Sequence, residues 1–321
     1  VRDAVKNGVA GRQPKINARW RTTPHASAAE FLDEAYQKIG KDLRKGRVIL
    51  CDADLEAELM GILATPIGRV PKQNPDRTLS DEGRFVHDER AVNLAGDKYN
   101  HPPAIQPRHR ELARTIIWWK LRVPGVPILM AKYDVDSAFK LLWVRAEDVC
   151  LFATELPGKP IGLETRVLVL HVTLTFGFGG APGEYMAFAW LDKQLHESAA
   201  PTDPHWHDDP PFVCKTLMDD KVMVEPQLGV RPWIAAWWAR HCMVQVFGQE
   251  ALNLSKLEEE GEFTTTKCNW GLNYDTVAET ISLPEPKIAK LRFLINESCF
   301  DYGGRQVAIS MVRSLAGLLV Y

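Results

Sequence analysis

The chain has 321 residues, is 45% apolar and carries a formal net charge of −2. This length and apolar content allow a large core divided among roughly two or three lobes, and they exclude a disordered tail. The apolar runs are too short to cross a bilayer and the N-terminal region lacks the apolar segment of a signal peptide, so we expect an intracellular protein with no membrane partner. Because the chain starts without a methionine and stops inside an apolar pattern, we expect it to be a domain of a longer polypeptide.

Cysteine spacing and charge distribution narrow the class of protein further. The six cysteines lack the close pairs that zinc and redox sites use, so we expect reduced and mostly buried thiols. A charge total near zero does not indicate nucleic-acid binding, but residues 1–48 carry eleven Lys/Arg against five Asp/Glu. Such a basic stretch fits a surface that faces nucleic acid, although a solvated face is the commoner explanation of a charge run.

Helices and short strands alternate irregularly along the chain. The elements predicted in the first half are, in order, a helix at 26–40, a loop at 66–82, a strand at 83–87, a proline-rich connector at 101–107, a helix around 111–121 and a strand at 126–135. The second half is predicted to contain a turn at 137–143, a pair of strands at 150–154 and 165–170, a helix at 183–197, a hairpin of strands 212–218 and 222–224 with its turn at 219–220, a helix at 232–246, strands around 268–274 and 280–283, and helices at 286–294 and 305–319. Helices flank short antiparallel strands and βαβ units are absent from the pattern, which predicts an α+β fold.

Two pairs of aspartates stand at the ends of apolar runs that are typical of strands. Asp134 and Asp136 follow the first run, Asp219 and Asp220 follow the second, and the glycine-proline element Leu174–Pro182 lies between them. Carboxylates from two strand ends can converge on divalent metal ions, and a Gly/Pro loop can lie flat beneath a base pair. An Asp-Asp pair alone is more often a solvated turn. The order of the three features therefore carries the prediction, which is a template-directed polymerase.

The same segments resemble the motifs of one family. Lys132–Phe139, Leu174–Pro182 and Leu217–Asp220, in that order, are similar to the metal-binding and nucleotide-binding motifs of reverse transcriptases, and the likeness extends over residues 66–320. The resemblance implies a right-hand polymerase fold with an antiparallel palm sheet, fingers and a partial thumb. The implied divisions are an N-terminal extension leading into the fingers at 1–65, fingers at 66–105 and 141–173, palm at 106–140 and 174–283, and a connection with the partial thumb at 284–321.

By this resemblance the chain is an RNA-directed DNA polymerase that adds deoxynucleotides to a primer 3′-hydroxyl. The implied cofactors are two Mg²⁺ ions, for which Mn²⁺ can substitute. The implied metal ligands are the side chains of Asp134, Asp219 and Asp220, which are also the catalytic residues, and the carbonyl of Val135. The implied partners are an RNA or DNA template-primer, deoxynucleoside triphosphates, and further domains of a retrotransposon- or retrovirus-like polyprotein, such as RNase H, a protease or a recombinase.

Further residues receive substrate-binding roles from the resemblance. Phe139 would lie beneath the incoming sugar and exclude a ribose 2′-hydroxyl. The alternative role for this residue is that of an ordinary aromatic side chain in the core. Lys72 and Arg84 resemble the fingers residues that hold the triphosphate. The guanidinium of an arginine suits bidentate contact with phosphate, and the ammonium of a lysine suits contact as a point charge. Phe176 and Gly177 belong to the loop that contacts the template and the nucleotide.

Near the C-terminal side, Lys256 resembles a lysine that can protonate the pyrophosphate leaving group, and Trp270 and Gly271 resemble the turn of a primer-gripping hairpin. The chain departs from the family at Leu217, where an aromatic residue is usual. The segment His205–Asp209 superficially resembles a metal cluster, but its proline-rich surroundings predict an exposed loop.

Three other functions compete with this interpretation. An RNA-dependent RNA polymerase shares the palm chemistry, but it commonly has a second aspartate where this chain has Ala138 and Phe139. A glycosyltransferase could use Asp134 and Asp136 for a nucleotide-sugar metal, but βαβ units would then be expected. A catalytically inactive nucleic-acid-binding relic of a retroelement is the third, and the filled aspartate positions disfavour it.

Asp88 and Arg90, near the fingers motif, can also form a purely structural ion pair.

Overall fold

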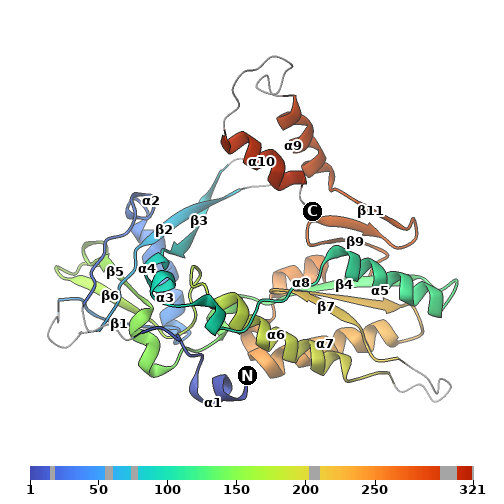
Figure 1. Cartoon of the computed structure of the whole chain (residues 1–321), viewed down its shortest axis with the longest axis horizontal. Helices are drawn as coiled ribbons and strands as arrows, with labels where there is room; N and C mark the ends of the chain where they lie inside the picture. The colour runs from blue at the N-terminus through green and yellow to red at the C-terminus, as the bar shows by residue number, and fades with distance from the viewer. Residues whose placement is uncertain (15–18, 55–60, 74–78, 202–209, 297–308, 320–321) are drawn as a thin grey trace. The chain divides into compact units, whose positions relative to one another are not determined.

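A computed structural model describes residues 1–14, 19–54, 61–73, 79–201, 210–296 and 309–319. The predicted His205–Asp209 loop, Cys299 and the start of the last predicted helix lie outside these described residues. The chain divides into two compact units, whose elements are labelled in Figure 1. The first unit comprises residues 1–106, 134–195 and 239–253, and the second comprises 107–133, 196–238 and 254–321. Within the described part of the chain, no helix is long and apolar enough to cross a membrane.

The first unit contains antiparallel strands with helices beside them. Its principal elements are α1 (Arg2–Asn7), α2 (Ala26–Ala29), α3 (Leu32–Arg44), β1 (Val48–Asp52), β2 (Ile67–Gln73), β3 (Leu79–His87), α4 (Arg90–Ala95), β5 (Ala153–Pro157) and β6 (Arg166–His171), while α6 (Ala181–Glu197) and α7 (Arg231–Phe247) contribute residues to both units. Strand β6 pairs with both β1 and β5 in antiparallel fashion. Ala35 and Ile39, one turn apart on α3, pack against Val167 and Val169, which share one face of β6.

The β2–β3 ribbon corrects the loop predicted at 66–82. Residues 67–73 form β2, which pairs with β3 although it contains Pro71. A proline is tolerated here because β2 is an edge strand of the two-stranded ribbon, and the register shifts between Pro71 and Gln73. The predicted helix at 26–40 is also interrupted, since α2 ends at Ala29 and α3 starts at Leu32.

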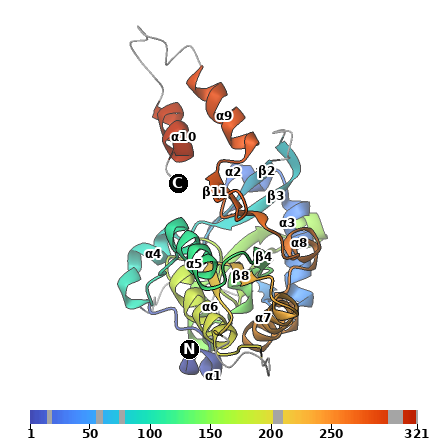
Figure 2. The ribbon, with the colours of Figure 1, turned by 90° about the vertical axis from the view of Figure 1, so that its right-hand side faces the viewer.

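The second unit is organised around a sheet of β4, β8 and β7, with α5 against it (Figures 1 and 2). Its elements are α5 (His109–Arg122), β4 (Ile128–Asp134), β7 (Cys214–Leu217), β8 (Asp220–Pro226), α8 (Leu254–Glu260), β9 (Thr266–Asn269), β10 (Leu272–Asp275), β11 (Thr280–Ser282), α9 (Glu285–Ile295) and α10 (Ile309–Leu319). Ile116 and Trp119 of α5 are buried against Met130 and Val224 of the sheet. The Trp119 indole also donates a hydrogen bond of 2.9 Å to the Val224 carbonyl, so the helix is fixed by both packing and polar contact.

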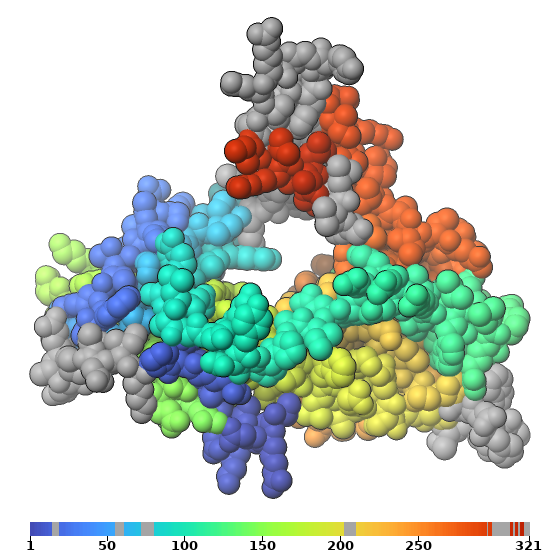
Figure 3. Space-filling model, in the orientation of Figure 1, coloured from blue at the N-terminus to red at the C-terminus, as the bar shows by residue number. Residues whose placement is uncertain are grey.

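A second antiparallel sheet, with strand order β11–β10–β9, leads into α9 and α10. These two helices contact each other, and the residues of α10 are the dark red group in Figure 3. The paired strands confirm the α+β class and the antiparallel pairing predicted from the sequence. The prediction of mostly buried thiols holds for Cys214 and Cys242 but not for the other described cysteines, because Cys51 and Cys150 are half-buried and Cys268 is exposed.

Candidate active site

The Asp219–Asp220 pair lies at the end of the β7–β8 hairpin in the second unit. Leu217 pairs with Asp220, so Met218 and Asp219 form a two-residue turn. The turn is therefore one residue earlier than predicted, and Asp220 is the first residue of β8. Met218 has a φ of 54°, which is uncommon for a residue with a side chain. The hairpin thus holds two adjacent carboxylates at its tip through an unfavourable backbone conformation, a feature that is frequent at functional sites.

Lys132 of β4 lies beside this hairpin. Its Nζ is 3.8 Å from Asp220 Oδ1 and 2.6 Å from Glu260 Oε2, and its side chain is 11% exposed. The amide of Gln227 donates to the Pro127 carbonyl at 2.8 Å, so the start of β4 lies beside the end of β8 and the strands run antiparallel. The last residues of β4 therefore lie beside the first residues of β8. The lysine offsets negative charge that would otherwise accumulate at this partly buried place.

Asp134 is the last residue of β4 and is 6% exposed. Its Oδ2 accepts a hydrogen bond of 2.8 Å from Asn253 Nδ2, and its carbonyl accepts one of 3.2 Å from the Asn253 amide. Asp136 is half-buried and accepts a hydrogen bond of 3.1 Å from the Ser137 hydroxyl. Asn253 begins the segment Asn253–Lys256, in which the resemblance gave a role to Lys256 only, and 119 positions separate Asn253 from Asp134.

Two of the predicted substrate-binding residues meet in the first unit. The ring centroids of Phe139 and Phe176 are 4.9 Å apart, and the ring centroids of Phe139 and Tyr185, which lies on α6, are 5.8 Å apart. Phe139 is half-buried, whereas Phe176 is 45% exposed. The cluster forms because Phe139 lies in a short 3₁₀ turn directly after β4 and Phe176 lies in the loop before α6. Phe139 thus contacts both of the other rings, and the three rings form an apolar cluster of which Phe176 is the exposed member.

Gly177 brings the glycine loop against the end of β3. Its φ is 118°, and a Cβ placed there would lie 2.1 Å from the His87 carbonyl oxygen. The His87 amide donates to the Phe176 carbonyl at 3.1 Å. Asn93 of α4 donates to the Gly177 carbonyl at 2.8 Å and accepts from the Gly179 amide at 2.7 Å. Only glycine allows this close backbone approach.

A buried carboxyl lies under the same loop. Glu89 is 2% exposed, and its Oε1 accepts a hydrogen bond of 3.0 Å from the Thr175 hydroxyl. Burial raises the pKa of Glu89 to about 8, against the opposing effect of that hydrogen bond. Because the folded-state pKa lies above the usual glutamate value of 4.5, the contribution of Glu89 to stability decreases as the pH rises through this interval.

We expect Gly177→Ala to destabilise the protein by about 1–3 kcal/mol, because a side chain at this φ is strained and its Cβ meets backbone. Gly162→Ala is the matched control, since Gly162 has a positive φ of 79° with nothing within 4 Å of the added Cβ. Urea denaturation of both variants measures the difference. Equal losses for the two variants would show that close packing against His87 contributes nothing.

The predicted triphosphate-binding residues lie on the β2–β3 ribbon. Arg84 is exposed on β3 and pairs across the ribbon with Val70, while Lys72 lies within β2. The ion pair expected of Asp88 and Arg90 is confirmed, with Arg90 Nε 2.7 Å from Asp88 Oδ1. This contact and a hydrogen bond to His25 hold the pKa of Asp88 below its usual range.

In the second unit, Trp270 and Gly271 form the two-residue turn between β9 and β10. Both have positive φ, 51° and 85°, which is the pattern of a type I′ hairpin turn. The Gly271 carbonyl accepts a hydrogen bond of 2.9 Å from Lys287 Nζ, and the His109 ring lies 5.8 Å from the Trp270 ring. Lys256 is exposed on α8.

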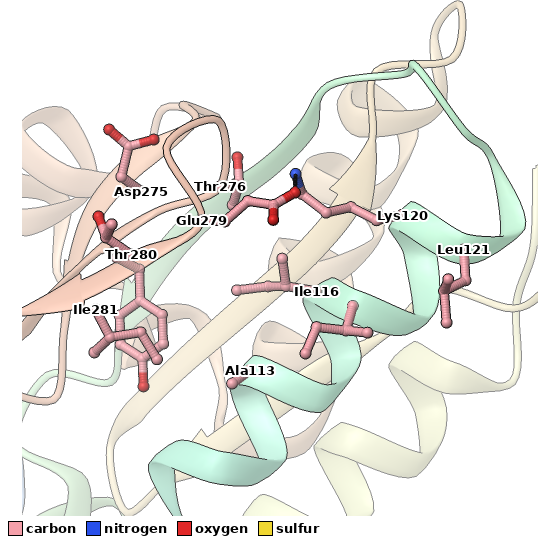
Figure 4. Close-up of a pocket in the computed structure, with 11 residues that line it drawn as sticks. Ala113, Ile116, Lys120, Leu121, Asp275, Thr276, Glu279, Thr280 and Ile281 are labelled. Atoms are coloured by element: carbon pink, nitrogen blue, oxygen red, sulfur yellow. Dashed lines mark hydrogen bonds and ion pairs between the residues drawn. The ribbon is translucent and has the colours of Figure 1, made fainter.

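A pocket of about 410 Å³ lies in the second unit between α5 and the β10–β11 hairpin, and the sequence did not indicate it (Figure 4). Its walls are mainly apolar and include Ile116, Leu121 and Ile281, while the ion pair of Lys120 and Glu279, 2.7 Å long, lies at its edge.

The candidate residues suit Mg²⁺ by donor type, because Asp134, Asp219 and Asp220 offer the carboxylate oxygens that this ion prefers. Lys132 and Asn253 contact two of these carboxylates and so restrain their positions. Among the residues that the structure describes, no group of three or more His, Cys, Asp or Glu side chains is arranged to hold a metal ion.

Comparison with known proteins identifies the fold. No family model matches the chain, and no curated protein matches it. A solved structure of a foamy viral protease-reverse transcriptase in complex with double-stranded DNA is similar over 97% of this chain and 50% of its own, with a TM-score of 0.60 and 14% identity. The chain has a reverse-transcriptase-like fold. A second structure of that foamy viral protein with double-stranded DNA, designated dRH, is similar over 97% of this chain and 43% of its own, with a TM-score of 0.61 and 14% identity. The chain therefore spans about half the length of the solved proteins that it resembles.

Proposed function

We propose that this chain is an RNA-directed DNA polymerase that extends a primer 3′-hydroxyl with deoxynucleotides. The observation that carries the proposal is a reverse-transcriptase-like fold in which the candidate carboxylates stand at the ends of two neighbouring strands or in the turn beside them. Strand β4 ends at Asp134, and the adjacent strand β8 begins at Asp220 directly after Asp219. The adjacency of β4 and β8 supports the proposal of a metal-dependent nucleotidyl transfer.

Asp134, Asp219 and Asp220, with the carbonyl of Val135, would hold two Mg²⁺ or Mn²⁺ ions. When bound, the two ions would activate the primer hydroxyl and stabilise the charge that develops on the triphosphate. Lys132 would limit repulsion between the carboxylates before substrate arrives, because its ammonium already lies within 3.8 Å of Asp220.

The other candidate residues would bind and orient substrate. Arg84 and Lys72, on the β2–β3 ribbon, would hold the triphosphate. The loop at Phe176 and Gly177, which Asn93 fixes in place, would lie against the base pair being formed. Lys256 would donate a proton to the pyrophosphate, and Trp270 and Gly271 would contact the primer strand.

The proposal extends to partners. The foamy viral structures contain double-stranded DNA and a protease joined to the reverse transcriptase. We propose by analogy that this chain binds an RNA or DNA template-primer, acts inside the cell, and belongs to a longer polyprotein of a retrotransposon or retrovirus-like element.

Two parallel measurements, of primer extension and of primer-template binding, test the proposal. A labelled DNA primer is annealed to RNA or DNA template of the same sequence, and extension with deoxy- or ribonucleotides is compared with binding by fluorescence anisotropy. DNA synthesis on the RNA template supports the proposal. Extension with ribonucleotides alone would favour an RNA polymerase, and binding without extension would indicate a non-catalytic nucleic-acid-binding protein.

Phe139→Ala should allow ribonucleotide incorporation while deoxynucleotide incorporation continues. The reason is steric: the Phe139 ring, held by Phe176 and Tyr185, would occupy the space that a 2′-hydroxyl needs. The measurement is the ratio of kcat/KM for the deoxy- and ribonucleotide in the wild type and the variant. Phe152→Ala removes a fully buried ring elsewhere in the first unit and is the control for general loosening. An unchanged ratio in Phe139→Ala would refute the assignment.

A further inference from the structure

Asn253 makes two hydrogen bonds to one residue. Its side-chain Nδ2 donates to Asp134 Oδ2 at 2.8 Å, and its backbone amide donates to the Asp134 carbonyl at 3.2 Å. Asn253 comes directly before α8, and Asp134 is the last residue of β4. The contact joins two positions that are far apart in sequence.

The backbone around Asn253 is itself fixed to the segment that follows β4. The Asp136 amide donates to the Ala251 carbonyl at 2.9 Å, and Val135 and Leu252 form an antiparallel bridge. Residues 134–136 and 251–253 therefore form a short antiparallel pair with Asn253 opposite Asp134. Because this pairing restrains the Asn253 backbone, the side-chain amide of Asn253 has little freedom to move.

The chemistry of an amide suits the support of a carboxylate that must stay negative. An amide donates a hydrogen bond without bringing a full positive charge, so it fixes the carboxylate plane without neutralising it. A lysine or arginine in its place would compete with a cation for the same carboxylate. The other candidate aspartates have different neighbours, Lys132 for Asp220 and Ser137 for Asp136.

We propose that Asn253 is a positioning residue that orients the Asp134 carboxylate for a divalent metal ion. This inference rests on the proposed function, because it assigns Asp134 as a metal ligand. Removing the Asn253 side chain should lower the affinity for the metal and the rate of nucleotide transfer by about 10- to 100-fold, the usual effect of losing a hydrogen bond to a metal ligand. The KM for the nucleotide, measured at saturating metal, should change little.

The test uses Asn253→Leu, which is similar in volume but has no amide, and Asn253→Ala, which retains the backbone hydrogen bonds with less steric risk. Asn7→Leu is the matched control, because Asn7 Nδ2 donates to Asp3 Oδ1 at 2.7 Å, an asparagine-aspartate pair on the exposed helix α1. Mn²⁺ affinity is measured by electron paramagnetic resonance in all variants and in Asp134→Asn. The Mg²⁺ concentration for half-maximal primer extension and the melting temperature are measured in parallel.

We expect Mn²⁺ affinity to be about 10- to 100-fold weaker in both Asn253 variants and in Asp134→Asn. The affinity of Asn7→Leu should be unchanged. A lower melting temperature with wild-type metal affinity would show a structural role only and would overturn the inference, while the proposed function would stand if the wild type extends primers. If the wild type extends none, the proposed function fails. The Mn²⁺ affinities then decide the inference separately: loss in the Asn253 variants supports it, and no change refutes it.

Discussion

Asp219→Asn is expected to reduce DNA synthesis by about 10³-fold or more, since a lost metal ligand removes several kcal/mol of transition-state stabilisation. The fold should survive, because Asp219 is half-buried in a two-residue turn and asparagine has the same shape. The measurement is single-nucleotide incorporation with Mg²⁺ at saturating substrate, beside a thermal unfolding curve.

Asp275→Asn is the matched control for this change. Asp275 also lies at a strand end in the second unit, where its Oδ1 accepts hydrogen bonds from the amides of Val277 and Ala278. The control variant should keep wild-type synthesis. Wild-type incorporation by Asp219→Asn would remove Asp219 from the proposed mechanism, whereas equal inactivation of the two variants would show that the assay reports general damage to turns.

Arg231→Met should destabilise the protein by about 3–5 kcal/mol, because it leaves a buried carboxylate without its partner. Arg231 Nε lies 2.6 Å from Glu225 Oε2, and the two side chains are 3% and 0% exposed. The guanidinium also donates to the carbonyls of Pro210 at 2.9 Å and Pro211 at 3.0 Å. Its Cζ lies 4.7 Å from the centroid of the Trp119 ring, so the pair connects β8 and α7 to α5.

The size of this effect should depend on pH. Burial raises the pKa of Glu225 to about 7, and Arg231 opposes that rise. Without Arg231 the folded-state pKa moves further above the usual glutamate value of 4.5, so the folded variant loses stability as the pH increases across this interval. Urea denaturation near pH 8 should therefore show a larger loss than denaturation near pH 5.

The double variant Glu225→Gln/Arg231→Met is the control, because it removes the buried charge together with its partner. It should recover part of the lost stability near pH 8 and show little dependence on pH. A pH-independent loss in Arg231→Met that the second substitution does not reduce would contradict the view that an uncompensated Glu225 causes it.

Local patterns predicted much of the fold. The helices α5, α6 and α7 and the β5–β6 and β7–β8 hairpins follow from apolar spacing and turn residues that act within a few positions. Strand β2 escaped prediction because Pro71 disfavours a strand unless it is an edge strand, and an edge position is a property of the assembled ribbon. Strand β1 escaped because its short apolar run gains its extended form from pairing with β6, more than a hundred residues later.

The sequence likewise predicted only part of the candidate site. Asp134 ends one strand and Phe139 follows it, while Phe176 and Gly177 share one loop, so the resemblance of two short motifs was sufficient to propose these residues. The supports of these residues come from distant segments: Asn253 is 119 positions from Asp134, and Asn93 is 84 positions from Gly177. Both asparagines belong to segments that resemble family motifs, but their supporting role could not be predicted, because it depends on which carboxylate or carbonyl the fold brings to them.

The most direct test of the proposed polymerase activity is incorporation of one deoxynucleotide into a labelled DNA primer on an RNA template, with Mg²⁺ and with EDTA. We expect the primer to grow by the nucleotide complementary to the template in Mg²⁺ and to remain unextended in EDTA. A wild-type protein that binds the primer-template but adds no nucleotide in either Mg²⁺ or Mn²⁺ would contradict the proposed function.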